Sequence, residues 1–137
     1  MYKKALLILC ILGLAAGSFA ADIPSGSKVI AYYFHGNFRC PTCYKLEQYS
    51  KEAIEANFKN ELASGKLTFK AINTDEKENE HFVNNYQLYT KSLIIFLIKD
   101  GKEVKSKNLT KIWDYVGDKK KFFEYVTDEI NSFLKGN

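Results

Sequence analysis

Two cysteines three positions apart, Cys40 and Cys43, constrain the fold of this chain more than any other feature. They lie where one sequence pattern gives way to another. Residues 28–34 are rich in Val, Ile and Tyr, which is typical of a β-strand. Apolar residues then recur at helical spacing over residues 41–64, on an arc wide enough to predict a helix packed against a sheet. The two thiols are therefore expected at a strand-to-helix junction, in the first turn of the helix.

The chain beyond this helix continues to alternate between strands and helices. The expected elements are a strand at 66–72, a polar helix at 77–86, a strand at 92–99, a strand at 102–105 and a last helix after Asp118. The unbroken apolar run at 93–98 is typical of a central strand covered on both faces. Asp100-Gly101 signals a two-residue hairpin. The order βαβαββα predicts an α/β fold, a four-stranded mixed sheet with helices on both faces.

Residues 1–20 have the three parts of a secretory signal peptide. Two lysines precede an apolar run at 5–17, and small residues at the end of the segment form a cleavage site after Ala20. The run is shorter than the roughly 20 residues that span a bilayer, so we expect cleavage, with an uncleaved membrane anchor as the alternative. A lipid anchor at Cys10 is not expected, because no small residue precedes this cysteine.

The remaining chain is expected to form one exported domain. Residues 21–27 are predicted to be a linker and residues 28–135 the domain. Eighteen basic and sixteen acidic residues remain after removal of Lys3 and Lys4, for a net charge of +2. No long basic stripe is left, so a nucleic-acid partner is not expected. The bacterial periplasm, or another extracytoplasmic location, permits disulfides.

The segment Cys40-Pro41-Thr42-Cys43 is predicted to be a redox-active dithiol. Pro41 suits the first helical position, where its missing N–H costs nothing. Cys40 would then lie over the unpaired N–H groups and the positive end of the helix dipole. Such surroundings lower thiol pKa values to roughly 3.5–7.5, against about 8.5 in a free cysteine. Cys40 is therefore expected to attack as a thiolate, with Arg39 as an added positive charge, and Cys43 to resolve the mixed disulfide.

Two other uses of the thiols remain open. A structural disulfide closing so short a ring would contribute about 2 kcal/mol at best. The reduced pair would also suit a soft ion such as Cu(I) or trivalent arsenic. A closed zinc site needs four ligands, and only His35 and His81 are available to complete one, so it is not expected. No nucleotide or flavin motif is present, and no cofactor is predicted.

Three residues outside the motif are candidates for supporting roles. His35 precedes the first cysteine by five positions, and it is either a proton shuttle for Cys43 or a solvent-exposed loop residue. Phe38 and Trp113 are candidates for an aromatic rim that docks a substrate.

The arrangement of strand, loop, dithiol and helix resembles the thioredoxin superfamily over residues 28–135. More narrowly, Phe38-Arg39-Cys40-Pro41-Thr42-Cys43 with Leu46-Glu47, Asn108-Leu109 and Ile112-Trp113 resembles the ArsF family. That family comprises small exported thioredoxin-like proteins named as subunits of a nitrophenyl-compound nitroreductase linked to nitroaromatic arsenicals. The resemblance implies a thiol–disulfide oxidoreductase or electron-transfer subunit. Its partner would be a redox protein or the reductase subunits, with membrane association only if the signal segment stays uncleaved.

The sequence departs from the thioredoxin pattern at two positions. Arg39 stands where thioredoxins usually carry Trp, and the stretch before the central strand has no proline. Ser92 is expected at the place of the thioredoxin cis-proline, which holds substrate backbone and keeps metals away from the dithiol. The absence of this proline favours the metal or metalloid alternative over general protein-disulfide exchange.

Overall fold

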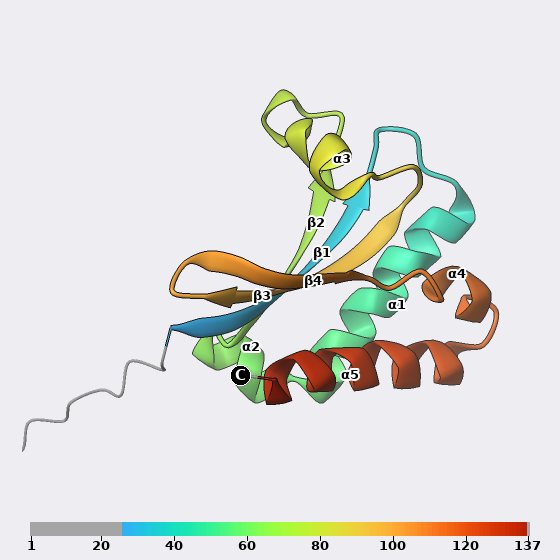
Figure 1. Ribbon diagram of the computed structural model, residues 1–137. Coiled ribbons are helices and arrows are strands. Elements are labelled where there is room, and N and C mark those ends of the chain that lie inside the picture. The colour runs from blue at the N-terminus through green and yellow to red at the C-terminus, as the bar shows by residue number, and fades with distance from the viewer. Residues whose placement is uncertain (1–25, 137) are drawn as a thin grey trace, which may run out of the picture.

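The computed structural model describes residues 26–136 (Figure 1). The predicted signal segment and all but the end of the linker lie outside these residues. The strands are β1 (Ser27–His35), β2 (Leu67–Asn73), β3 (Ser92–Lys99) and β4 (Lys102–Asn108). The helices are α1 (Pro41–Asn57), α2 (Lys59–Ser64), α3 (His81–Tyr86), α4 (Ile112–Tyr115) and α5 (Lys119–Lys135), with a 3-10 turn, η1, at Lys77–Asn79.

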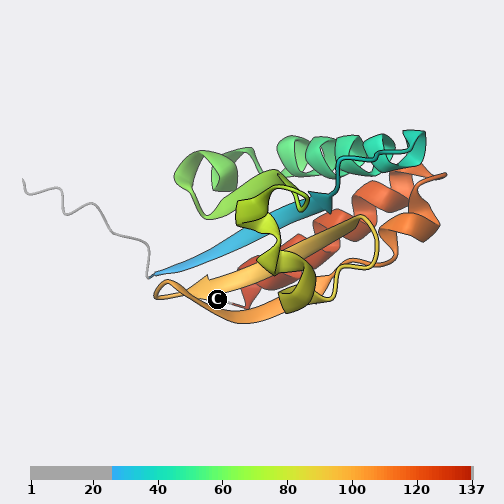
Figure 2. The same ribbon diagram turned by 90° about the horizontal axis from the view of Figure 1, so that it is seen from above.

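The four strands form one mixed sheet in the order β2-β1-β3-β4. β1 pairs in parallel with β2 and antiparallel with β3, and β4 returns antiparallel beside β3. The predicted four-stranded mixed sheet is therefore confirmed. β1 is an inner strand of this sheet. The loop that follows β1 therefore places the cysteines near the middle of the row of strand ends. Figure 2 shows this loop and α4 at one end of the sheet, and the start of β1 with the β3–β4 hairpin at the other.

Side chains of β1 alternate between the two faces of the sheet, and each face has its own cluster of apolar residues. Val29, Ala31 and Tyr33 belong to the main core, which α1 and α5 cover. Phe34 packs on the opposite face with Ile94, Phe96 and the aromatic side chains of α3. Helices therefore lie on both faces, as predicted, and the main core packs between the sheet and α1.

The helix predicted over residues 41–64 is interrupted at Phe58, which separates α1 from α2. Phe58 leaves the helical region (φ −131°, ψ 37°) and buries its ring in the main core. The side chain of Asn57 donates to the Ala53 carbonyl, a backbone acceptor at the end of α1. The free energy gained by burying the phenyl ring thus exceeds the cost of interrupting the helix at Phe58. The predicted polar helix at 77–86 is likewise shorter, because η1 occupies its first turn.

The predicted turn and cap are both present. Asp100 and Gly101 have φ values of 52° and 76°, the left-handed pair that a tight hairpin of this type requires. Asp118 accepts a hydrogen bond from the Lys121 N–H at 3.2 Å and caps α5. The strand after the hairpin is longer than predicted and runs to Asn108. Within residues 26–136, no helix has the length and apolar character needed to cross a bilayer.

Candidate redox site

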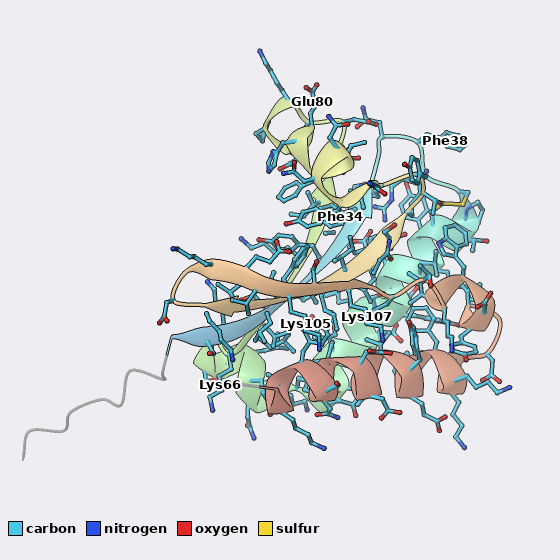
Figure 3. The ribbon with its side chains drawn as sticks, in the orientation of Figure 1. Phe34, Phe38, Lys66, Glu80, Lys105 and Lys107 are labelled. Carbon is cyan, nitrogen blue, oxygen red and sulfur yellow. A yellow bond between two sulfur atoms is a disulfide. The ribbon has the colours of Figure 1, made fainter. Side chains whose placement is uncertain are left out.

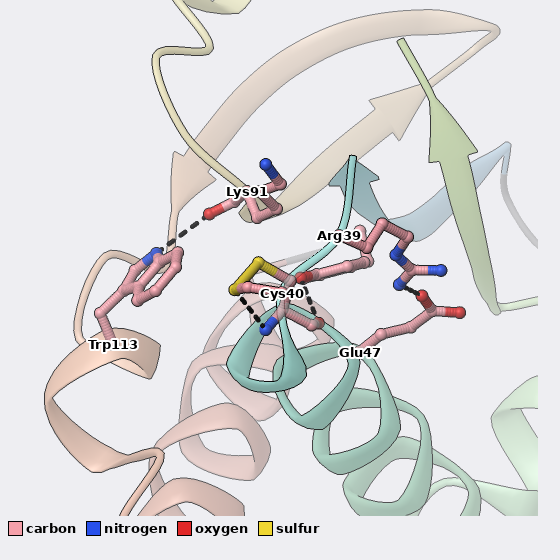
Figure 4. The surroundings of a disulfide bond; sticks show 7 residues. Arg39, Cys40, Glu47, Lys91 and Trp113 are labelled. Carbon is pink, nitrogen blue, oxygen red and sulfur yellow. Dashed lines mark hydrogen bonds and ion pairs between the residues drawn. A yellow bond between two sulfur atoms is a disulfide. The ribbon is translucent and has the colours of Figure 1, made fainter. Parts of the chain in front are cut away.

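Cys40 and Cys43 form a disulfide at the start of α1, with their Cα atoms 5.0 Å apart. Cys40 is the N-cap residue in extended conformation, as expected of a residue that precedes proline, and Pro41 opens the helix. The Cys43 N–H points at the Cys40 sulfur over 3.2 Å (Figure 4). Thr42 lies between them in the first turn, partly buried. The sequence therefore fixes the two sulfurs at the positive end of α1.

The two cysteines differ in exposure. Cys40 is partly exposed, whereas only 2% of Cys43 is exposed. A partner from solution therefore reaches the disulfide at Cys40, and Cys43 is available only from within the protein. This asymmetry suits the predicted division between an attacking and a resolving thiol.

Tyr33 supports the second cysteine from the sheet. Its buried hydroxyl donates to the Cys43 carbonyl at 2.7 Å. Burial raises the pKa of Tyr33 to about 12, although the nearby Arg39 charge acts to lower it. The hydroxyl therefore stays protonated and remains a donor over the physiological range. Sequence reasoning missed this residue; the available signal was a polar hydroxyl at an inward-facing position of β1.

The positive charge of Arg39 is paired and not free to act on the cysteines alone. Its guanidinium forms an ion pair with Glu47 of α1, and its Cζ lies 4.3 Å from the centre of the Tyr44 ring (Figure 4). The side chains of Arg39 and Glu47 are both partly buried. Arg39 Nε is buried without a hydrogen-bond partner within the described part of the chain. The positive charge expected beside Cys40 is thus balanced by a carboxylate that sequence reasoning had not assigned to the site.

The candidates outside the motif occupy different places. The His35 Nδ1 lies 3.0 Å from the Gly36 carbonyl, its ring stacks on Tyr33, and no hydrogen bond found within residues 26–136 joins it to a cysteine. Trp113 is partly buried, and its Nε1–H donates to the Lys91 carbonyl at 3.0 Å. Phe38 is 80% exposed. Of the two rim candidates, Phe38 is therefore the one with a free aromatic surface.

The segment before β3 lies beside the disulfide, as Lys91 shows in Figure 4. Ser92 is buried at its end, and the Ser92 hydroxyl donates to the Thr90 carbonyl. The peptide bonds of residues 26–136 are all trans. These same residues contain no group of three or more His, Cys, Asp or Glu side chains placed to hold a metal ion. His81 lies at the start of α3, on a different element from the cysteines, with its ring against Phe82.

The sheet order β2-β1-β3-β4, together with a dithiol motif between β1 and α1, defines a thioredoxin-like fold. No family model matches the sequence, and no curated protein matches it. Among solved structures, the chain is similar to Fasciola hepatica thioredoxin, with 22% identity over 66% of this chain and 79% of that one and a TM-score of 0.40. The chain is also similar to a mutant of Entamoeba histolytica thioredoxin, with 21% identity over 66% of this chain and 83% of that one and a TM-score of 0.39. A Thermus thermophilus thioredoxin has 16% identity, coverage of 66% and 72%, and a TM-score of 0.38.

Proposed function

We propose that this protein carries two electrons between partners by thiol–disulfide exchange at Cys40 and Cys43. The observation that supports it is the disulfide at the start of α1, with one partly exposed and one buried sulfur. A partner's thiolate attacks the Cys40 sulfur, the Cys40–Cys43 bond breaks, and Cys43 leaves as a thiolate. The partner's second thiolate then attacks its own sulfur in the mixed disulfide and releases Cys40. The partner ends as a disulfide and this protein as a dithiol; the reverse sequence returns the electrons.

The geometry favours this exchange through the leaving thiolate. When the mixed disulfide is resolved, Cys40 departs as an anion at the N-cap of α1, next to the Cys43 N–H and the positive end of the helix dipole. Tyr33 holds the Cys43 backbone against the sheet throughout. Pro41 and Thr42 complete the first turn that sets the spacing of the two sulfurs.

We propose further that the protein works outside the cytoplasm as an exported subunit. The signal-like segment at 1–20 supports this, and a compartment outside the cytoplasm permits the disulfide of the oxidised state. Its partner would be a redox protein or the subunits of a reductase. Membrane association would follow only from an uncleaved N-terminal segment.

A role in a system that reduces nitroaromatic or arsenical compounds is the narrower proposal. It rests on the resemblance to the ArsF family, and three residues that carry this resemblance surround the disulfide. Arg39 pairs with Glu47 beside it, and Trp113 is tied to Lys91 across from it (Figure 4). The resemblance therefore falls on residues that build the site.

The test is the reduction potential of the cysteine pair, measured by equilibrating the protein in graded thiol–disulfide buffers. A reversible two-electron transition between about −120 and −270 mV is expected for an exchanging pair. A potential below roughly −300 mV would instead indicate a structural disulfide. A pair that stays reduced and binds Cu(I) or trivalent arsenic one-to-one, with binding lost in Cys40→Ser, would replace electron transfer by dithiol binding. A variant with both cysteines changed to serine is the control.

A further inference from the structure

A cleft of about 230 Å³ opens at the loop that leads from β1 to Cys40, where the strands β1 and β2 end. His35, Gly36 and Phe38 form one wall, Thr74 and Asp75 the second, and residues 88–91 the third. The ring of Phe34 closes the inner end. An apolar cavity of roughly 150 Å³ already accommodates benzene, so this cleft has room for one aromatic side chain.

Gly36 keeps the cleft open. A Cβ at this position would lie 2.8 Å from the Asp75 Oδ2, closer than two such atoms can approach. The same oxygen accepts the Asn37 N–H at 2.6 Å. A side chain at position 36 would therefore press on the oxygen that makes this bond. The Asp75 carboxylate is committed to holding the loop.

Two aromatic side chains stand on the rim with almost no protein against them. Phe38 is 80% exposed and Tyr89 is 91% exposed, the most exposed large hydrophobic side chains in the described chain. Figure 3 shows Phe38 pointing outward from the loop that leads to the cysteines, while Phe34 lies inside. Exposed aromatic surface gathered at one cleft marks an interaction site more than scattered apolar residues do. Contact with an aromatic side chain of a partner would stabilise both rings.

The charge of the cleft selects among aromatic guests. The Lys91 Nζ lies 5.8 Å from the centre of the Phe38 ring, and Lys91 forms no ion pair within residues 26–136. The one acidic wall residue, Asp75, is bonded to the loop backbone. The mouth of the cleft therefore presents an aromatic surface with a free positive charge next to it, which complements an aromatic group close to a carboxylate.

We propose that this cleft binds an aromatic side chain, next to an acidic one, in the partner polypeptide segment that exchanges its disulfide with Cys40. Phe38 precedes Cys40 by two residues, which span at most about 7 Å even when extended. A segment joined to the Cys40 sulfur therefore brings its neighbouring side chains to the cleft. The proposal rests on the proposed redox function and adds the recognition of its partner.

The test uses Cys43→Ser in a Cys10→Ser background, which leaves Cys40 as the single thiol, and peptides whose one cysteine carries a 2-thiopyridyl disulfide. The Cys40 thiolate attacks the peptide sulfur, a protein–peptide S–S bond forms, and 2-thiopyridine leaves with the electron pair. Its absorbance gives the rate. Three kinds of peptide are compared. The residues near the cysteine include Tyr and Glu in the first kind, include Tyr and Lys in the second, and are only Ala in the third.

The best Tyr–Glu peptide is expected to react about ten-fold faster than the Ala peptide, as one aromatic contact and one exposed ion pair allow. Phe38→Ala and Tyr89→Ala should each lower this ratio towards one, and Lys91→Glu should make the Tyr–Lys peptide the faster one. Val104→Ala, which removes an exposed apolar side chain of β4 outside the cleft, should leave the ratio unchanged.

Equal rates for all three kinds of peptide would overturn the cleft proposal but leave the redox proposal standing. An equal fall of the ratio in Val104→Ala would also overturn it, because the selectivity would then come from general apolar adhesion. No reaction with any peptide would overturn both. The wild-type disulfide, reduced by the same peptides as free thiols, should give the same ratios and does not depend on how well Cys43→Ser folds.

Discussion

The hydroxyl of Tyr33 donates a hydrogen bond to the carbonyl of Cys43 at 2.7 Å, in the buried space between β1 and the first turn of α1. It ties the buried cysteine to the central strand. We expect Tyr33→Phe to lower the free energy of unfolding by about 1 kcal/mol, the typical contribution of one such bond. The reduction potential should become less negative, because a less firmly held Cys43 closes the disulfide less readily.

Tyr32→Phe is the matched control, since Tyr32 is the neighbour on the same strand and packs on the opposite face of the sheet. It should leave the potential unchanged. Denaturant titration and equilibration in thiol–disulfide buffers measure the two effects separately. Equal potentials for Tyr33→Phe and the wild type would show that this hydrogen bond stabilises the fold without positioning the thiol.

The Arg39–Glu47 ion pair is expected to set the charge near Cys40. Glu47→Gln removes the carboxylate and leaves the guanidinium unbalanced, which favours the Cys40 thiolate and makes the potential less negative by on the order of 10–20 mV. Arg39→Gln leaves the carboxylate unbalanced and should shift the potential the other way. The rate of Cys40 alkylation below pH 7 should follow the same order.

Glu55→Gln serves as the control, because Glu55 lies further along α1 in an exposed pair with Lys51. Shifts of the same sign in the two site variants would contradict the electrostatic explanation and would instead point to general loosening of the first turn.

Much of the fold was accessible from the sequence because it depends on local patterns. The apolar run at 93–98 predicted β3, Asp100-Gly101 predicted the hairpin, and Asp118 predicted the start of α5, and all three are present. The place of the disulfide followed in the same way, since Pro41 marks the first turn of a helix directly after a strand.

The supporting residues of the site were not accessible in this way. Tyr33 bonds to a backbone carbonyl ten positions away, and Arg39 pairs with Glu47 across the start of a helix, so neither partner follows from helical or strand spacing. The break at Phe58 carries no Gly or Pro signal and results from burial of its ring. Such features depend on how strand and helix pack, which composition and periodicity do not specify.

Trp113 links α4 to the segment before β3 through the Lys91 carbonyl. Trp113→Phe keeps an aromatic ring but removes the N–H donor, so the free energy of unfolding should fall by about 1 kcal/mol. Phe38→Ala, at a position that is 80% exposed, should change it by less than about 0.5 kcal/mol. Chemical denaturation compares the two, and a loss below about 0.5 kcal/mol in Trp113→Phe would show that the indole hydrogen bond contributes nothing measurable.

Tyrosine titration provides a test of the burial of two hydroxyls, one on each face of the sheet. Burial raises the pKa of Tyr33 to about 12, and burial with a hydrogen bond to Glu103 raises that of Tyr86 to about 12. Since the folded protein holds these protons more tightly than the unfolded chain, their contribution to stability is complete below about pH 10 and is lost as the pH rises towards 12. Absorbance titration of the oxidised protein should show a late phase, and Tyr33→Phe and Tyr86→Phe should each remove one tyrosine from it. Unchanged late phases in both variants would place the two hydroxyls in contact with water.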